Sequence, residues 1–324
     1  MKYFLTGATG FLGGVMARKL LEKNHEVVAL VRNPDNAKTL IDLGATVIQG
    51  DVTEKESMRD AMKNCDGVFH VAAWYKVGVR DKSPGYKINV EGTRNVLELM
   101  KELNIKKGVY TSTLAINSNT HGKLMDESYH YNGNHLSEYD RTKALAHEVA
   151  KQFIKEGLPL VIVMPGLIYG PDGTSLTDEA LRLYLKKKLP MISSGAMYCW
   201  AHVEDVAEGH LLAMEKAPTG STYIICGPSH SIKEAFTIAH KITGIRKPIP
   251  IPPWMLKMTA AMVKPIELVF TMPEMYASET LFVSSDITYL GDNGKAKKEL
   301  DYNPRPLEEG LKQTLEYELQ KMKK

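Results

Sequence analysis

A tyrosine and a lysine spaced for proton transfer are the residues of this sequence with the clearest chemistry. Tyr139 and Lys143 lie four residues apart within 138–156, a segment whose pattern predicts a helix. Residues four apart share one helix face, so the phenol and the ammonium can converge on one bound molecule. A nearby ammonium stabilises phenolate and lowers the pKa of a tyrosine from its ordinary value of about 10. The pair therefore predicts a general acid and base, although the same spacing also arises by chance on surface helices.

A glycine-rich turn follows the first apolar run of the chain. Gly7, Gly10 and Gly13 come directly after the apolar residues 3–5, and an amphipathic stretch at 15–23 follows them. The first glycine permits a tight turn, the second lets backbone approach a pyrophosphate, and the third lets the helix pack close to the strand. The helix N-terminus also presents free N–H groups to an anion. We expect a dinucleotide here rather than a purely structural turn, contacted by Thr6, Gly7, Thr9, Gly10, Phe11, Leu12 and Gly13.

Strands that alternate with helices must position these groups. Apolar runs of strand type are separated by helical stretches such as 90–104 and 138–156, a rhythm that predicts a parallel, doubly wound α/β sheet. In such a sheet all strand carboxyl ends meet at one edge, where ligands bind. The predicted strands are 3–5, 26–31, 46–49, 67–71, 107–111 and 160–164.

The second half of the chain has a looser rhythm. We expect a dinucleotide-binding domain over 1–165, with a return strand near 221–226, and a smaller, discontinuous substrate-binding region over 166–324. Methionines and aromatic side chains gather there, and they predict either an adaptable apolar pocket or a helical core or dimer contact. They are Trp200, Trp254, Met255, Met258, Met262, Phe270, Met272 and Met275.

The end of the second predicted strand indicates which dinucleotide is bound. An acidic residue there would bind the ribose diol of NAD, but this chain has Arg32, with Lys38 further on. A guanidinium can grip a 2′-phosphate with two hydrogen bonds. Asp35 and Asp42 come too late to replace the missing acid. We therefore expect NADP(H) rather than NAD(H), the alternative being an ordinary surface arginine.

The motifs together resemble one enzyme superfamily. Thr6 before a Gly-x-x-Gly-x-x-Gly turn, the Thr-Ser-Thr of 111–113 and the Tyr-x-x-x-Lys pair are similar to the extended branch of the short-chain dehydrogenases/reductases. The resemblance covers most of the chain and is greatest to dihydroflavonol reductases and 3β-hydroxysteroid dehydrogenases. The segment 31–34 with Lys38 resembles that of the dihydroflavonol and cinnamoyl-CoA reductases, which use NADP.

The resemblance implies roles for the motif residues. Tyr139 would protonate a carbonyl oxygen, Lys143 would lower the tyrosine pKa and bind the nicotinamide ribose, and Thr113 would hydrogen-bond the substrate oxygen. Ser112 is the second choice for that last role. The cofactor would supply the hydride.

Further positions follow from the same resemblance. Asp51 and Val52 would contact adenine, and the alternative for Asp51 is a helix N-cap. Ala72 and Ala73 would let backbone approach the cofactor. The nicotinamide amide would be contacted by Pro165, Gly166 and Ile168, before which Met164 replaces the usual arginine. Asn89 is open to an N-cap or a proton-relay role. Trp74 and Tyr75 follow the fourth strand and are our expected substrate-lining aromatics. The segment 202–207 is interpreted as structural, with Glu204 and Asp205 near a helix N-terminus.

The expected function is an NADP(H)-dependent oxidoreductase that interconverts an aldehyde or ketone with its alcohol. A sugar-nucleotide epimerase on the same fold is the alternative. Many epimerases hold the substrate diphosphate with an arginine where this chain has Tyr198, although Arg182 or the lysines of 186–188 could substitute. Dehydratases carry Asp-Glu after the catalytic threonine, but Leu114 follows Thr113 here. A non-catalytic NADP-binding protein would have lost part of the Thr-Tyr-Lys set, which is complete.

Composition and charge argue against other classes. The 324 residues carry a net charge of +3 with both signs interspersed, so we expect no nucleic-acid partner. The chain begins with a core strand and its most apolar late stretch, 254–272, is interrupted by charges and proline, so we expect neither a signal peptide nor a membrane span. Three cysteines without paired spacing predict no disulfide, no metal site and a cytoplasmic location. A homodimer through 90–104 and 138–156, common in the superfamily, is left open.

Overall fold

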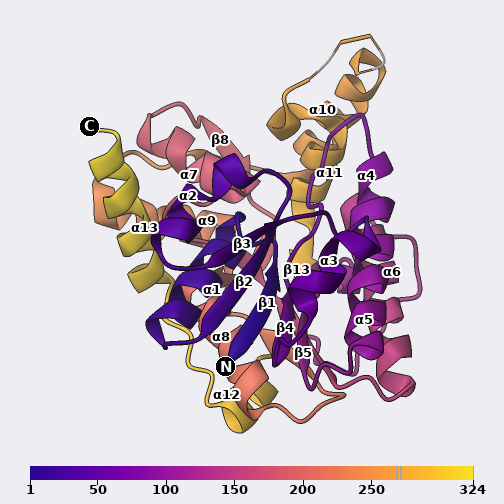
Figure 1. Ribbon diagram of the computed structural model, residues 1–324. Coiled ribbons are helices and arrows are strands. Elements are labelled where there is room, and N and C mark those ends of the chain that lie inside the picture. The colour runs from indigo at the N-terminus through magenta and orange to yellow at the C-terminus, as the bar shows by residue number, and fades with distance from the viewer. Residues whose placement is uncertain (268, 271, 324) are drawn as a thin grey trace.

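A seven-stranded parallel sheet forms the centre of the molecule in the computed structural model, which describes residues 1–267, 269–270 and 272–323 (Figure 1). The strand order β10-β6-β5-β4-β1-β2-β3 reverses beside β1. The expected doubly wound, Rossmann-type α/β sheet is therefore confirmed, and its reversal point is where such sheets bind ligands. The strands are β1 (Lys2–Thr6), β2 (Glu26–Val31), β3 (Thr46–Gln49), β4 (Gly67–His70), β5 (Gly108–Thr111), β6 (Leu160–Pro165) and β10 (Thr222–Ile225).

Helices cover both faces of this sheet. α1 (Phe11–Glu22), α2 (Lys38–Asp42), α8 (Val203–Lys216) and α12 (Gly294–Leu300) pack on one face, and α3 (Lys55–Met62), α5 (Gly92–Glu102) and α6 (Glu138–Lys155) on the other. Side chains alternate along each strand, so in β1 Tyr3 and Leu5 join the first core while Phe4 joins the second. Burial on both faces explains why the strands are nearly continuous apolar runs.

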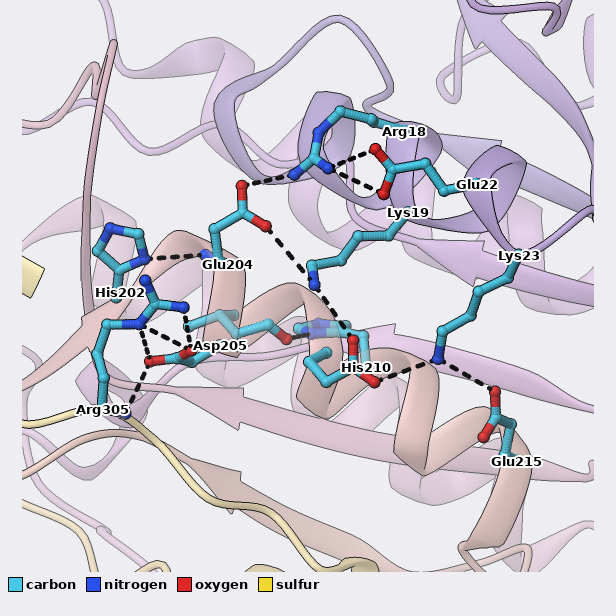
Figure 2. Close-up of polar contacts among 12 residues, drawn as sticks. Arg18, Lys19, Glu22, Lys23, His202, Glu204, Asp205, His210, Glu215 and Arg305 are labelled. Carbon is cyan, nitrogen blue, oxygen red and sulfur yellow. Dashed lines mark hydrogen bonds and ion pairs between the residues drawn. The ribbon is translucent and has the colours of Figure 1, made fainter. Parts of the chain in front are cut away.

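Ion pairs join α1 to α8 across the rim of the first core (Figure 2). Arg18 contacts Glu204 at 2.5 Å, and Lys19 and Lys23 both contact Glu208 at 3.2 Å. These side chains are partly exposed, so each pair contributes little by itself. Together they set the position of α8, which begins next to the glycine turn.

The second half of the chain adds a small mixed sheet beside the carboxyl edge of the large one. β9 (Met197–His202) lies at its centre and pairs with β7 (Leu167–Tyr169), β11 (Ser229–Ser231) and β13 (Thr288–Tyr289). α7 (Leu176–Leu185), α9 (Ile232–Thr243) and α13 (Leu307–Lys321) pack around it in a third core. β8 (Met191–Ser193) and β12 (Ile249–Ile251) form a separate two-stranded ladder.

The methionine-rich segment forms a helical hairpin that stands out from the rest of the molecule at the top of Figure 1. It comprises α10 (Pro253–Ile266), a 3-10 turn at Glu274–Tyr276 and α11 (Ser278–Asp286). Trp254, Met258 and Met262 are 60%, 56% and 68% exposed. The α10 side chains therefore neither line the cavity described below nor form a core. Trp200, by contrast, is buried against Tyr169.

The helix expected over 90–104 begins earlier than its pattern indicates. A turn, α4 (Ser83–Tyr86), and a π-helical segment at Lys87–Glu91 run without a break into α5. Asn89 therefore lies inside a helical run, and the N-cap interpretation of it is wrong. Within the described ranges, every helix is too short or too polar to cross a lipid bilayer. The same residues bring no three His, Cys, Asp or Glu side chains together as metal ligands.

Candidate active site

A cavity of about 710 Å³ lies at the carboxyl edge of the large sheet. Residues that follow β1, β2, β4, β5 and β6 line one side, and residues of the second half, from Thr174 to Tyr289, line the other. The glycine turn and the Tyr139–Lys143 pair both face this space. The groups that the sequence connects with a dinucleotide and with proton transfer therefore share one cavity.

The glycine turn is shaped by close backbone contacts. Gly7 has φ +73°, and a Cβ there would lie 2.8 Å from the Ala72 nitrogen. A Cβ at Gly13 would lie 2.1 Å from the Gly7 carbonyl oxygen, so only glycine lets α1 start this close to the turn. Gly10 caps α1 without any side-chain hydrogen bond to the first N–H groups. The helix N-terminus is thus free to meet an anion.

Thr6 differs from its expected place among the cofactor contacts, because it does not line the cavity. It is fully buried, and its hydroxyl oxygen accepts hydrogen bonds from the backbone of Val71 and Ala72, both at 3.1 Å. It also contacts His70, 2.8 Å away, and His70 reaches Thr93 at 3.0 Å. Burial lowers the pKa of His70 to about 3, so this histidine is neutral. Thr6 joins the ends of β1 and β4 beneath the turn.

The end of the cavity next to β2 and β3 contains Arg32, Asp51 and Val52. The Arg32 guanidinium makes no ion pair with any residue that the structure describes. Asp51 accepts from the backbone and hydroxyl of Thr53 at 2.8 and 2.9 Å, while Glu54 caps α3, so the N-cap alternative for Asp51 is wrong. Lys38 is exposed at the start of α2 and does not line the cavity, contrary to our expectation.

Lys143 is held by the end of β5 rather than by Tyr139. Its ammonium donates to the Thr111 carbonyl oxygen at 2.7 Å and to the Tyr110 hydroxyl at 3.2 Å. Burial lowers the pKa of Lys143 to about 7. Burial also raises the pKa of Tyr139 to about 12, opposed by the neighbouring Thr113 hydroxyl. The tyrosine pKa is therefore raised, mainly by desolvation, and the Lys143 ammonium is not among the groups that shift it.

The two hydroxyl candidates after β5 have different surroundings. Ser112 contacts Nδ1 of buried His147 at 2.9 Å. The Thr113 oxygen accepts from the Ala115 N–H at 3.2 Å, which leaves the threonine proton free to donate towards the cavity. Thr113 is thus the better placed of the two to meet a substrate oxygen. Behind them, His210 of α8 contacts the Thr111 hydroxyl at 2.9 Å and fixes the end of β5.

The loops after β4 and β6 complete the walls. Ala72, Ala73 and Tyr75 line the cavity after β4. Trp74 does not: its ring packs against Gly85 of α4, and its backbone is bound by the Asn89 side chain, so it differs from the expected substrate-lining role. After β6 the lining residues are Pro165, Gly166, Leu167 and Ile168, whereas Met164 is buried in the core.

Comparison with known proteins places this geometry in a family. The model of the NAD dependent epimerase/dehydratase family matches residues 3–226, which include all seven strands of the large sheet. The chain belongs to this family. It is an extended short-chain dehydrogenase/reductase and hence an NAD(P)-dependent enzyme acting on CH–OH or C=O groups.

Individual relatives of this epimerase/dehydratase family member cover most of its length. A putative dihydroflavonol 4-reductase of Synechocystis sp. is 33% identical over 270 residues, which are 81% of this chain and 78% of that protein. A 4-hydroxy-2-methyl-3-oxo-4-farnesyl-3,4-dihydroquinoline-1-oxide ketoreductase of Stigmatella aurantiaca is 30% identical over 249 residues, 76% of this chain and 74% of that protein. The solved structure of gox2253 has a TM-score of 0.84 at 29% identity and covers 98% of both chains.

The cationic side chains of the cavity bear on whether a diphosphate could bind at its substrate side. Among the described residues that line the cavity, three carry a cationic side chain. Arg32 lies at the end next to β2 and β3, Lys143 lies on α6 with Tyr139, and Lys76 pairs with Glu274 at 2.9 Å. Arg182 and Lys186, the suggested substitutes, line a separate hollow near α13. The position of the epimerase arginine is occupied by Tyr198, which does line the cavity.

Sequence reasoning missed several lining residues of this extended reductase fold. Asp140, Glu274, Thr280 and Tyr289 all face the cavity. The acid inside the Tyr-x-x-x-Lys motif could have signalled Asp140. No local signal exists for Tyr289, because β13 reaches the site only through its pairing with β9.

Proposed function

We propose that this protein is an NADP(H)-dependent reductase that converts an uncharged aldehyde or ketone to its alcohol, or runs the reverse reaction. One observation carries the proposal: Thr113, Tyr139 and Lys143 line the same cavity as the glycine turn. A hydrogen-bond donor, a proton donor and a cation in one cavity support a site at which a nicotinamide and a carbonyl group would meet.

The residues present fit a dinucleotide phosphate. The backbone approach at Gly7 and Gly13 leaves no space for side chains, and the uncapped start of α1 offers N–H groups to a pyrophosphate. Arg32, free of ion pairs within the described chain, is suited to a 2′-phosphate. Asp51 and Val52 would hold adenine, while Ala72, Ala73 and the loop at 165–168 would hold the nicotinamide end.

The chain's own residues would handle the proton. NADPH would supply the hydride. With a pKa raised to about 12, the Tyr139 phenol is protonated at neutral pH and can donate its proton to the carbonyl oxygen as negative charge develops there. The Thr113 hydroxyl would donate a hydrogen bond to the same oxygen. Lys143, held at Thr111, would place its charge beside the ribose and favour recovery of the proton by Tyr139.

The two parts of the chain would divide the work. Residues 1–165, with β10, would bind the cofactor, and 166–324 would supply the substrate side, since Tyr198, Thr280 and Tyr289 line that half of the cavity. Tyr75, 51% exposed at the mouth, remains our candidate for a substrate-lining aromatic. The names of the Synechocystis and Stigmatella relatives favour a ketone. A homodimer and a cytoplasmic location stay predictions.

The decisive experiment follows the absorbance of reduced nicotinamide with NADPH or NADH against aldehydes, ketones and UDP-sugars. We expect oxidation of NADPH with a carbonyl compound and release of free NADP⁺. Interconversion of UDP-sugars without net change of cofactor would instead assign the epimerase activity. Cofactor binding without turnover of any compound would assign a non-catalytic NADP-binding protein.

A further inference from the structure

Three polar side chains meet in the cavity next to the Tyr139 phenol. Asp140 comes from α6, Tyr289 from β13 and Tyr198 from β9, and all three line the cavity. The Tyr289 hydroxyl donates a hydrogen bond of 2.8 Å to Oδ2 of Asp140. The rings of Tyr198 and Tyr289 lie 6.0 Å apart. Residues far apart in sequence thus build one polar cluster in the wall of the cavity.

This cluster has unused hydrogen-bonding capacity. Asp140 is only 2% exposed, and its carboxylate is stabilised by the Tyr289 hydroxyl at 2.8 Å and by the Ser137 hydroxyl. A carboxylate can accept about four hydrogen bonds, so acceptor sites remain for a further partner. The Tyr198 hydroxyl takes part in no hydrogen bond with the described chain. Both groups face the cavity, where a hydroxyl of the substrate can complete their hydrogen bonds.

The surrounding charges limit what that partner can be. Asp140, Glu179 and Glu274 are the acids on the substrate side of the cavity, and Lys76 is already paired with Glu274. Burial raises the pKa of Asp140 to about 7, so above neutral pH it is mainly a carboxylate, and a phosphate or carboxylate placed next to it would meet a like charge. A hydroxyl group can donate to the carboxylate and accept from the Tyr198 phenol without any such cost.

We propose that Asp140, Tyr198 and Tyr289 form a subsite that binds a hydroxyl group of an uncharged carbonyl substrate, close to the carbonyl that Tyr139 protonates. This inference rests on the proposed reductase function. Tyr289 orients the Asp140 carboxylate, and Asp140 and Tyr198 bind the hydroxyl. A substrate without the hydroxyl leaves these groups unpaired in a buried site, which is how an enzyme rejects an analogue that lacks one polar group.

The kinetic test compares 2-hydroxycyclohexanone with cyclohexanone. The ratio of their kcat/KM values is measured for wild type and for Asp140→Asn, which keeps the size of the side chain and removes its charge. Comparison of ratios cancels the intrinsic reactivity of each ketone. We expect the preference for the hydroxylated ketone to be about tenfold smaller in the variant than in wild type, which corresponds to the loss of one hydrogen bond to a charged group. Asp60→Asn, an 89% exposed acid on α3, is the matched control and should keep the wild-type ratio.

A second variant guards against misfolding of the first. Tyr198→Phe removes a hydroxyl that has no partner in the described chain, so the fold should survive and the same ratio should fall. Circular dichroism and the unfolding temperature verify the fold of both variants. Ratios that stay at the wild-type value in correctly folded Tyr198→Phe and Asp140→Asn would overturn the subsite.

A binding measurement separates this inference from the proposed function. Cyclohexane-1,2-diol and cyclohexanol are titrated by calorimetry into wild type and Tyr198→Phe without cofactor, so that no turnover occurs. The subsite predicts that the diol binds about tenfold more tightly than cyclohexanol to wild type only. Diol selectivity without turnover of any carbonyl compound would refute the reductase and keep the subsite. Equal affinities of diol and cyclohexanol for wild type would refute the subsite, whatever the enzyme reduces.

Discussion

The Lys143 ammonium lies 2.7 Å from the carbonyl oxygen of Thr111. This contact joins α6 to the end of β5, and His210 supports Thr111 from the opposite face of the sheet. The lysine is thus directed at the end of β5, and not at the phenol four residues before it. Burial raises the pKa of Tyr139 to about 12, so the phenol is protonated at neutral pH.

Replacing Tyr139 with phenylalanine tests the proton donor. We expect Tyr139→Phe to lower kcat about a thousandfold, the usual contribution of a general acid, while the dissociation constant of NADPH changes no more than a few-fold. Stopped-flow turnover and fluorescence titration of NADPH measure the two effects. Tyr86→Phe, at a 46% exposed position, is the control. Wild-type turnover in Tyr139→Phe would remove the acid from the mechanism.

Burial of Lys143 predicts a pH dependence of stability in the cofactor-free protein. Its pKa is about 7 in the fold against 10.5 for an ordinary lysine. Between these two pH values the unfolded chain therefore binds a proton at this side chain and the folded protein does not. A lowered pKa gives stability that is full above pH 10.5 and is lost as the pH falls towards 7. The limiting slope is roughly 1.4 kcal/mol per pH unit.

Lys143→Met removes that titration. Thermal unfolding of both proteins between pH 7 and 10.5 should show the variant gaining relative to wild type as the pH falls. The lost hydrogen bond to Thr111 adds only a constant offset. Lys101→Met, at an exposed lysine, should follow wild type at every pH. A difference between Lys143→Met and wild type that does not change with pH would contradict the burial argument.

Cofactor choice depends on Arg32. Arg32→Asp places an acid at the end of β2, where it repels a 2′-phosphate and accepts from a ribose diol. We expect the ratio of kcat/KM for NADPH over NADH to fall at least about a hundredfold, as expected for loss of a guanidinium–phosphate contact and gain of a repulsion. Arg246→Asp, at an exposed position outside the cavity, makes the same charge change and should leave the ratio as it is. Tighter binding of NADH than NADPH by wild type would overturn the NADP assignment.

Adjacent glycines in α1 offer a matched pair of variants. Gly13→Ala would place a methyl group 2.1 Å from the Gly7 oxygen, so the turn must open, and we expect lower NADPH affinity together with destabilisation of about 1–3 kcal/mol. At Gly14 the nearest atom would be 3.6 Å away, and alanine there should be neutral or stabilise the helix by up to about 1 kcal/mol. Chemical denaturation and NADPH titration compare the two. Equal behaviour would show that close packing at Gly13 is unimportant.

The Asp205–Arg305 pair should stabilise the contact between α8 and the segment before α13. Arg305 donates to both Asp205 oxygens at 2.7–3.0 Å, and Asp205 is only 9% exposed (Figure 2). Arg305→Ala removes the guanidinium and leaves the carboxylate with the backbone N–H of residue 305, at 2.9 Å, so it should cost up to about 3 kcal/mol of unfolding free energy. Lys63→Ala, from an exposed pair with Asp60, should cost under about 0.5 kcal/mol. If the double variant Arg305→Ala with Asp205→Asn is no more stable than Arg305→Ala alone, burial of the Asp205 charge is not the cause of the lost stability.

Local rules in the sequence determined much of this protein. Apolar strand runs, the glycine spacing after β1 and the position of Arg32 depend on short-range chemistry, so the sheet, the turn and the family could be predicted from them. The same holds for Thr113, Tyr139 and Lys143, which parallel strand topology brings to one edge. These features can be recognised in the sequence because each depends on residues that lie a few positions apart.

Only the tertiary structure decided the rest. Thr6 lies beneath the turn instead of in the cavity because the segment directly after β4 presents two N–H groups to its hydroxyl. The Trp74 ring turns away from the cavity because Gly85 leaves room for it. The methionines of α10 are exposed, although the sequence pattern would bury them. Tyr289 lies 149 residues after Asp140 and contacts it because β13 pairs with β9. Such contacts depend on how distant elements pack, and desolvation in that packing, not the neighbouring lysine, sets the pKa of Tyr139.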